Sequence, residues 1–452
     1  MRIFICLNTA KDMYLAAQIN NTLSKNNLKY ELDYYDFNLE VNWAAGPAHY
    51  NFFHILTNHK NNVCLTSNTH LNNSEYLFKC LKVAKQLEYD VYCFSFWDSY
   101  VDIQLLMALE IKKHNPRAKI LFGGPDIILR PYLGEILKKI GFDYSTGDID
   151  VSLHEYITDY SGFYDKKHTQ KMNMLASNDV PKYTKEELDY LNHAIMISTS
   201  RGCANSCRFC SSPALSNFSY VPRNALVDWF SYYNDIGVKE VNPNDSTFNK
   251  AEFDILLNGL INIDNKIIIS RADVSFVDLR KDQIAKMAQA QFKEVCIGFE
   301  CLHPIMQKNI NKKMPPVDEI LLYLEEFQKY EISVKLFYIA GIPSQTDEIF
   351  YDELEVIKYV DENFSNVYFE FYDYFISPMS YIDKHPEKFN IRKETKFNNF
   401  ISKLPEFKNE ILKFQNGIKA NPDDQKIDLY MKKLYSAVNK TVNMDNSSLY
   451  VN

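Results

Sequence analysis

Strand-like and helix-like segments alternate regularly between residues 193 and 380 of this chain. The strand candidates are Ile195–Thr199, Glu240–Asn242, Ile267–Ser270, Val295–Phe299, Val334–Ile339 and Val367–Phe371. The helical patterns between them cover Ala225–Ile236, Glu252–Ile261, Lys281–Ala290, Val317–Tyr330 and Glu348–Glu362. Strands that alternate with helices predict an α/β fold with a parallel sheet. Six strands are fewer than the eight of a closed TIM barrel, so we expect a partial (β/α)6 barrel of that type.

A similar alternation occupies the N-terminal part of the chain and predicts a Rossmann-like parallel sheet. Its strand candidates include Arg2–Leu7, Val91–Phe96 and Lys119–Phe122. Gly123 and Gly124 directly follow the last of these runs. Ligands of such sheets bind beyond the carboxyl ends of the strands. These glycines therefore either let the backbone approach a ligand closely or simply form a tight turn.

These patterns divide the chain into four predicted parts. They are a Rossmann-like domain at 1–160, a polar linker at 161–192, the partial barrel at 193–380 and a mainly helical C-terminal region at 381–452. Of the 452 residues, 46% are hydrophobic and 24% are charged, as in ordinary globular proteins. No apolar run approaches the roughly 18 residues of a membrane span. The net charge of −8, with scattered Lys and Arg, gives little reason to expect nucleic-acid binding.

Three cysteines directly follow the first strand of the predicted barrel. Cys203, Cys207 and Cys210 have the spacing C-x3-C-x2-C. Three thiolates on one loop can reach three corners of a 4Fe–4S cluster, which leaves its fourth iron open to another ligand. A zinc site or a chance grouping is the alternative, but structural zinc usually needs four ligands and no second C-x2-C pair is present. The odd total of nine cysteines does not suggest a disulfide framework, so a reducing cytoplasm is expected.

With Phe209 directly before the third cysteine, this motif resembles that of the radical S-adenosylmethionine (SAM) superfamily. The resemblance implies that SAM chelates the open iron through its amino and carboxylate groups. Electron transfer from the cluster then cleaves a carbon–sulfur bond and gives a 5′-deoxyadenosyl radical. A reductant such as flavodoxin or ferredoxin is the expected electron donor. Phe209 is expected to lie against the adenine, with core packing as the alternative.

Four residues near later strand ends resemble further site positions of this superfamily. Asp245 stands where relatives carry a Gly-Gly-Glu-like segment that receives the amino group of SAM, although it could instead cap the next helix. Arg271 resembles an arginine that pairs with the carboxylate of SAM. Glu300 resembles an acidic residue near the ligand; for both, a structural ion pair is the alternative. Cys301 could donate hydrogen to a substrate radical, although a buried cysteine more often only packs.

The predicted N-terminal domain in front of the barrel resembles the cobalamin-binding branch of the superfamily. The matching segments are Phe94–Phe96, Phe122–Pro125 and Gly147–Asp150. The resemblance implies an enzyme that modifies an unactivated C–H bond of a peptide or natural-product intermediate, with cobalamin-dependent methylation as the first expectation. A second reading is cobalamin-independent epimerisation, cyclisation or cross-linking of a ribosomally made peptide. A third is a non-catalytic iron–sulfur or zinc protein that binds a partner. The sequence does not identify the substrate.

Overall fold

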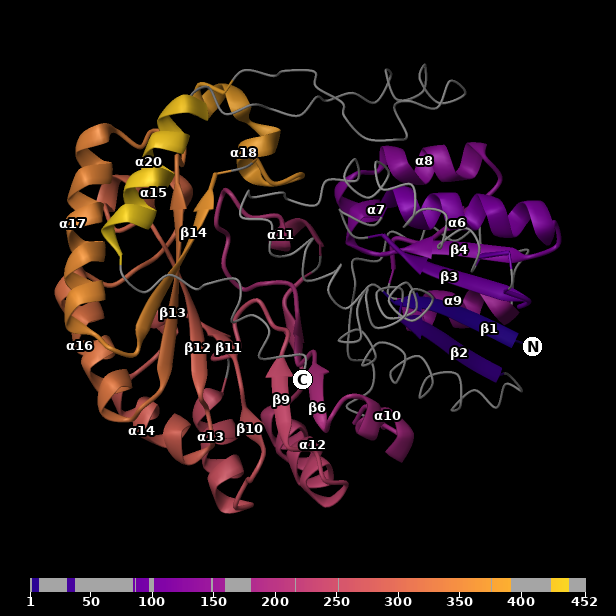
Figure 1. Ribbon diagram of the computed structural model, residues 1–452, viewed down its shortest axis with the longest axis horizontal. Helices are drawn as coiled ribbons and strands as arrows, with labels where there is room; N and C mark the ends of the chain where they lie inside the picture. The colour runs from indigo at the N-terminus through magenta and orange to yellow at the C-terminus, as the bar shows by residue number, and fades with distance from the viewer. Residues whose placement is uncertain are drawn as a thin grey trace. The chain divides into compact units, whose positions relative to one another are not determined.

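A computed structural model gives the fold of the chain (Figure 1). It describes residues 2–7, 31–36, 84–85, 87–96, 101–147, 149–158, 180–215, 217–250, 252–374, 376–391 and 424–438. These residues belong to two compact units. The first holds the described residues up to 158 together with 181–183, and the second holds residue 180 and the described residues from 184 onward.

The first unit is built on a five-stranded parallel sheet. Its strands are β1 (Arg2–Leu7), β2 (Glu31–Asp36), β3 (Val91–Ser95), β4 (Lys119–Gly123) and β5 (Asp143–Tyr144). They lie in the order β2-β1-β3-β4-β5, and every neighbouring pair is parallel. This is the flavodoxin-like order, which changes direction between β1 and β3. The Rossmann-like prediction is therefore confirmed.

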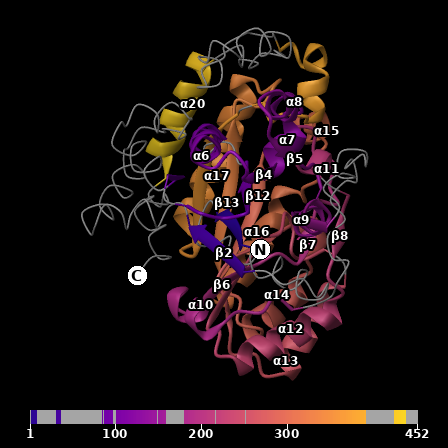
Figure 2. The ribbon, with the colours of Figure 1, turned by 90° about the vertical axis from the view of Figure 1, so that its right-hand side faces the viewer.

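Helices cover both faces of this first sheet. They are α6 (Val101–His114), α7 (Pro125–Leu129), α8 (Tyr132–Lys139) and α9 (Ile149–Thr158). Figure 2 shows α6 on one side of the sheet and α9 on the other. A strand covered on both faces needs apolar residues on both, and the first four residues of β3 are all buried. Phe122 packs against Phe94 and Phe96 with ring centroids 5.3 and 4.7 Å away.

The second unit contains parallel strands that neighbour one another in chain order. They are β6 (Ala194–Ile197), β9 (Glu240–Pro243), β10 (Ile268–Ile269), β11 (Ala272–Val274), β12 (Glu294–Glu300), β13 (Ser333–Ala340) and β14 (Val367–Asp373). One sheet has the order β10-β9-β6 and the other β11-β12-β13-β14. The predicted parallel α/β sheet is confirmed. The third predicted strand is replaced by two short strands, β10 and β11, which Ser270 and Arg271 separate. The first pairs with β9 and the second with β12.

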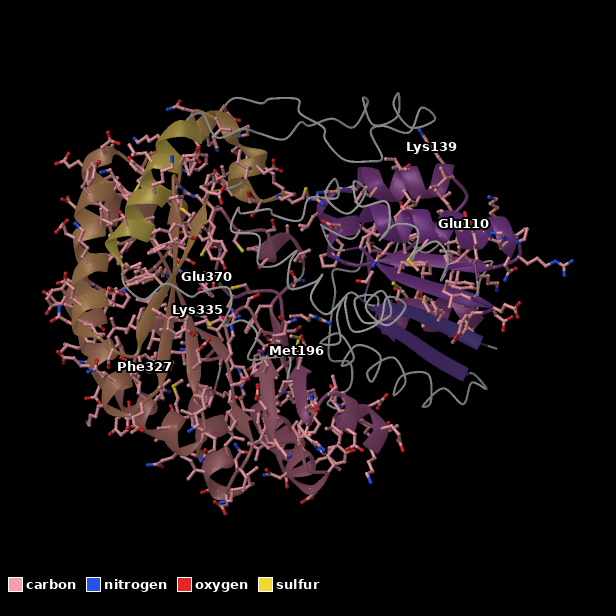
Figure 3. The ribbon with its side chains drawn as sticks, viewed as in Figure 1. Glu110, Lys139, Met196, Phe327, Lys335 and Glu370 are labelled. Carbon is pink, nitrogen blue, oxygen red and sulfur yellow. The ribbon has the colours of Figure 1, made fainter. Side chains whose placement is uncertain are left out.

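Five long helices of this unit follow the predicted pattern to within two residues. They are α12 (Arg223–Asp235), α13 (Phe253–Asn262), α14 (Lys281–Gln289), α16 (Val317–Lys329) and α17 (Asp347–Asn363). In Figure 1, α14, α16 and α17 lie along the outer side of the strands. Alternate residues of β13 are buried, from Val334 to Ala340. Figure 3 shows Phe327 of α16 on the outer side, whereas Lys335 and Glu370 lie together on the inner side.

Residues 181–192 of the predicted linker include a short helix, α10 (Lys185–Tyr190). The hydroxyl of Thr184 accepts a hydrogen bond from Glu187 N at 3.2 Å, and the Glu187 carboxylate accepts one from Thr184 N at 2.6 Å. This reciprocal capping box fixes the start of the helix. Residues 161–179 of the linker lie outside the described part of the chain.

A late helix, α20 (Asp424–Ala437), packs on β13, β14 and α17. The ring of Tyr430 stacks on Phe350 with centroids 3.7 Å apart. Ile427 fills the space beside Gly341, whose φ of +82° and missing side chain let the chain bend there directly after β13. The expectation of helix near the C-terminus is confirmed for this element. Among the described helices, none has both the length and the apolar character to cross a membrane.

Candidate functional site

The loop after β6 carries the three clustered cysteines. A short antiparallel pair, β7 (Ser200–Arg201) with β8 (Ser219–Tyr220), forms its base. Cys203, Cys207 and Cys210 are partly buried and form no disulfide. The thiol of Cys207 interacts electrostatically with the other two. In a 4Fe–4S cluster each thiolate binds a different iron, so three free thiols on one loop are a suitable donor set for three corners.

Each of these cysteines has a different polar neighbour. The sulfur of Cys203 lies 3.9 Å from the Thr247 hydroxyl, and the sulfur of Cys210 accepts a hydrogen bond from Ser212 N at 3.4 Å. Cys207 instead interacts with the ammonium of Lys312. Burial raises the pKa of the Cys207 thiol to about 12, and Lys312 acts in the opposite direction. Neighbours of this kind tune iron–sulfur clusters through hydrogen bonds and charge.

One end of α15 (Pro304–Ile310) holds the middle of the cysteine loop. The backbone N–H of Arg208 donates to the carbonyl of Ile310 at 2.8 Å. The Asn311 side-chain amide donates to the carbonyl of Ser206 at 2.9 Å and to its hydroxyl at 2.8 Å. These contacts fix the loop on both sides of Cys207.

The segment after β14 holds the same loop from a second direction. The Ser211 hydroxyl donates to the Pro378 carbonyl at 2.6 Å, and the backbone N–H of Ile382 donates to the Arg208 carbonyl at 3.0 Å. Ile382 belongs to α18 (Tyr381–Lys384), which the 3-10 turn η5 (Pro386–Phe389) follows. The cysteine loop is therefore fixed by elements that lie more than a hundred residues later in the chain.

Asp245 is buried and turned toward the start of the cysteine loop. Its carboxylate accepts four hydrogen bonds, from the N–H and hydroxyl groups of Thr199 and Ser200, at 2.5–2.9 Å. Burial raises the pKa of Asp245, and these hydrogen bonds act against that shift. Helix α13 has Glu252 at its N-cap, so the helix-capping alternative for Asp245 is wrong. The geometry favours a positioning role, and contact with the amino group of SAM stays a prediction.

Arg271 lies in the interruption between β10 and β11, two residues after the end of β10 and directly before β11. Its guanidinium is 3.7 Å from the Asp273 carboxylate and 5.8 Å from the ring centre of Phe337. Burial raises the pKa of Asp273 to about 6 although Arg271 acts in the opposite direction. The arrangement includes the predicted structural ion pair. Pairing with the carboxylate of SAM stays a prediction for Arg271.

Glu300 ends β12 at a bulge and has a φ of +21°. Its carboxylate forms an ion pair with Lys312 at 2.7 Å, and both side chains are largely buried. A Cβ on Gly298 would collide with both charged groups, so the glycine makes room for the pair. The sequence predicted a partner for Glu300 without identifying it, because nothing in Asn311-Lys312-Lys313 distinguishes the buried lysine from the exposed one.

Phe209 and Cys301 meet in one apolar cluster. Its buried members include Met306, Ile310 and Ile342, and Phe209 packs against it. Cys301 has no exposed surface, and burial raises the pKa of its thiol above the ordinary value. These apolar surroundings favour the interpretation that Cys301 is a buried packing residue. Hydrogen donation by Cys301 and adenine contact by Phe209 stay predictions.

A buried carboxylate that the sequence analysis missed supports the backbone after Cys301. Glu353 accepts hydrogen bonds from Leu302 N at 2.6 Å, His303 N at 2.9 Å and the Tyr338 hydroxyl at 2.7 Å. Glu353 lies on the buried face of α17 with Ile349 and Leu354. An acidic residue on an apolar helix face was the signal that could have identified it.

The inner face of the second unit is polar. The Lys335 ammonium lies 3.4 Å from the Glu370 carboxylate and 3.9 Å from that of Glu294 (Figure 3). The Tyr368 hydroxyl donates to Glu294. Cys296 pairs in register with Lys335 on the next strand. This row of charges and hydroxyl groups lies on the face opposite the covering helices.

Gly123 and Gly124 of the first unit lie at the carboxyl end of β4. The carbonyl of Gly123 accepts a hydrogen bond from Phe96 N at 2.8 Å. Gly124 has a φ of +98°, and a Cβ there would lie 2.6 Å from the Phe96 carbonyl oxygen. Packing within the protein therefore accounts for Gly124, as the tight-turn alternative predicts. Ligand contact by either glycine stays a prediction.

The parallel barrel strands and the three-cysteine loop define the class of protein. Residues 197–357 match the model of the Radical SAM superfamily. The chain belongs to this superfamily and is a radical SAM enzyme. The family implies a 4Fe–4S cluster and SAM as cofactors.

Two curated proteins are distant relatives in sequence. An uncharacterised protein of Methanocaldococcus jannaschii is 22% identical over 340 residues, which are 70% of this chain and 71% of that protein. The bacteriochlorophyllide d C-12(1)-methyltransferase of Chlorobaculum tepidum is 24% identical over 164 residues. The latter match spans 34% of this chain and 35% of the methyltransferase.

Two solved structures share the fold over 97% of this chain. The radical SAM methyltransferase TsrM from Kitasatospora setae, with tryptophan substrate and a SAM analogue bound, has a TM-score of 0.67, 10% identity and 89% of its own chain covered. The cobalamin-dependent SAM radical enzyme OxsB has a TM-score of 0.54 and 13% identity, with 58% of its chain covered. At these identities the similarity establishes the fold.

Proposed function

We propose that this enzyme uses cobalamin to transfer a methyl group to a carbon atom of its substrate. The observation that carries the proposal is the flavodoxin-like sheet that precedes a radical SAM barrel in one chain. TsrM, described with cobalamin bound in a second structure, and OxsB share this fold. The sequence relative from Chlorobaculum tepidum is a methyltransferase.

The two units supply different binding sites in this proposal. Cys203, Cys207 and Cys210 hold the cluster, and the carboxyl ends of β1, β3 and β4 receive cobalamin at the point where the strand order changes direction. When bound, the cluster and SAM supply radical chemistry and the methyl group, and cobalamin carries that group. The chain itself positions the cluster loop through Asp245 and through the backbone of α15.

The substrate binds on the inner face that carries Lys335. The lysine lies between two carboxylates, so this face suits a substrate with charged or hydrogen-bonding groups better than a wholly apolar one. A peptide or a natural-product intermediate has such groups. A flavodoxin or ferredoxin supplies the electron, and free thiols together with an iron–sulfur cluster suit a reducing cytoplasm.

The test is anaerobic purification from cells that are grown with hydroxocobalamin. The proposal expects about four iron atoms per chain together with stoichiometric cobalt. SAM with a deuterated methyl group should then give deuterated methylcobalamin, which mass spectrometry detects. The Cys203→Ala variant is the control that should lose iron and retain cobalt. Full iron without cobalt would contradict methyl transfer through cobalamin and would favour cobalamin-independent peptide modification.

A further inference from the structure

Lys312 is a buried ammonium group beside the cluster loop. It follows α15 by two residues, and its own backbone N–H donates to the Gln307 carbonyl at 2.9 Å. Only 18% of its side chain is exposed, and its ion-pair partner Glu300 is 12% exposed. A charged lysine is rarely buried without a partner. Here the Glu300 carboxylate supplies the opposite charge, and Lys312 also interacts with the sulfur of Cys207, which is a thiolate only when it binds iron.

The backbone fixes Lys312 relative to Cys207. Arg208 and Ser206 flank Cys207, and they are hydrogen-bonded to Ile310 and Asn311, the two residues before Lys312. These bonds hold the backbone at Lys312 beside the loop, and the ion pair with Glu300 holds its side chain. The other cluster cysteines have neutral polar neighbours, Thr247 and Ser212. Cys207 differs from them because its neighbour carries a full charge.

We propose that Lys312 is a positioning residue that raises the reduction potential of the cluster, and that Glu300 limits this effect. A 4Fe–4S cluster becomes more negative when it gains an electron. A fixed ammonium beside one of its thiolates stabilises the reduced form more than the oxidised form, and the effect is strong where water is excluded. The paired carboxylate offsets part of the ammonium charge. The inference rests on the cluster and is independent of cobalamin.

The experiment is a redox titration of the reconstituted full-length protein without SAM, followed by electron paramagnetic resonance. Lys312→Met should shift the midpoint potential to a more negative value, whereas Glu300→Gln should shift it to a more positive one. Lys312→Arg keeps the charge and should stay close to the wild type. Each tenfold change in the relative stability of the reduced cluster corresponds to about 59 mV for a one-electron couple.

Lys313→Met is the matched control, because it removes the same charge from the next residue, which is exposed. It should leave the midpoint potential unchanged. If Lys312→Met binds full iron and keeps the wild-type potential, the proposal is overturned. The proposal is also overturned if Lys312→Met and Glu300→Gln shift the midpoint potential in the same direction. If Lys312→Met does not assemble a cluster, Glu300→Gln decides, and the absence of a positive shift refutes the proposal. A lack of cobalt would contradict the methyl-transfer function and leave this test unaffected.

Discussion

The carboxyl ends of the parallel strands present different groups in the two units. In the first unit, Gly123 and Gly124 turn against the backbone of Phe96, and the edge offers main-chain groups and small residues. In the second unit, the corresponding edge carries thiols, the buried Asp245 and the Glu300–Lys312 pair. Both edges follow from parallel topology, which collects strand ends on one side. Among the described residues, the first is a shape-based edge formed by closely packed backbone, whereas the second is a side-chain edge formed by thiols and charged groups.

The strongest way to test this contrast is to remove one thiol from the side-chain edge. Cys207→Ala should abolish cluster binding, so that iron falls from about four atoms per chain to nearly none. Release of 5′-deoxyadenosine from SAM should stop as well. Iron analysis and chromatography check the two outcomes. Cys93→Ala, a buried thiol in β3 of the first unit, is the control and should keep its iron. A Cys207→Ala protein with full iron would contradict the assignment.

A side chain added to the shape-based edge should damage only the first unit. Gly124→Ala introduces a Cβ 2.6 Å from the Phe96 oxygen at a φ of +98°. The backbone strain alone costs about 1–3 kcal/mol, and the collision adds to it. Urea unfolding measures the loss, and iron content should not change. Gly141→Ala at a φ of +83° has no atom within 4 Å of its Cβ, so it isolates the strain. If Gly124→Ala and Gly141→Ala lose the same free energy of unfolding, the structure has relieved the collision at residue 124.

Asp245→Asn tests whether the second edge depends on a single buried carboxylate. The amide keeps the shape but presents N–H groups to the N–H of Ser200 or Thr199, so hydrogen bonds are lost. We expect a loss of about 1–3 kcal/mol in the free energy of unfolding and slower recovery of the cluster during reconstitution. Asp235→Asn on the exposed end of α12 should change stability by less than about 0.5 kcal/mol. If Asp245→Asn and Asp235→Asn have the same stability and recover the cluster at the same rate, Asp245 has no positioning role.

The smallest expected effect is a pH dependence from the second unit. The pKa of Asp273 rises from 3.8 to about 6 on folding, mainly through burial. The folded protein therefore holds this proton more tightly, and the resulting stability is present below about pH 4 and lost as the pH rises through about 6. The side chain is 39% exposed, so we expect less than about 1 kcal/mol. Urea unfolding between these pH values should show a shallower decline for Asp273→Asn. Parallel curves for variant and wild type would contradict this assignment.

The sequence was sufficient for the elements that apolar periodicity determines. The five long helices of the second unit end within two residues of their predicted bounds, because each buries one stripe against the strands. The interruption at Arg271 was not predictable in this way. It depends on where β10 stops pairing with β9 and β11 starts pairing with β12, and such long-range pairing leaves no local pattern.

The candidate site likewise contains residues that the local sequence predicts and residues that depend on long-range contacts. Cys203, Cys207 and Cys210 were recognisable because one loop holds all three ligands. Lys312 was not, because its burial depends on the bulge at Glu300 and on the space beside Gly298. The sequence identified Asp245 and Cys301 as residues, but their hydrogen bonds and packing became visible only with the fold.

The packing of Ile427 beside Gly341 has a consequence for the timing of folding. Ile427 follows Gly341 by 86 residues in the chain. At a synthesis rate of about 5–20 residues per second, the bend after β13 waits roughly 4–17 s for its covering helix. During that time the bend at Gly341 lacks its contact with Ile427. The bend therefore gains its packing partner only when α20 has emerged.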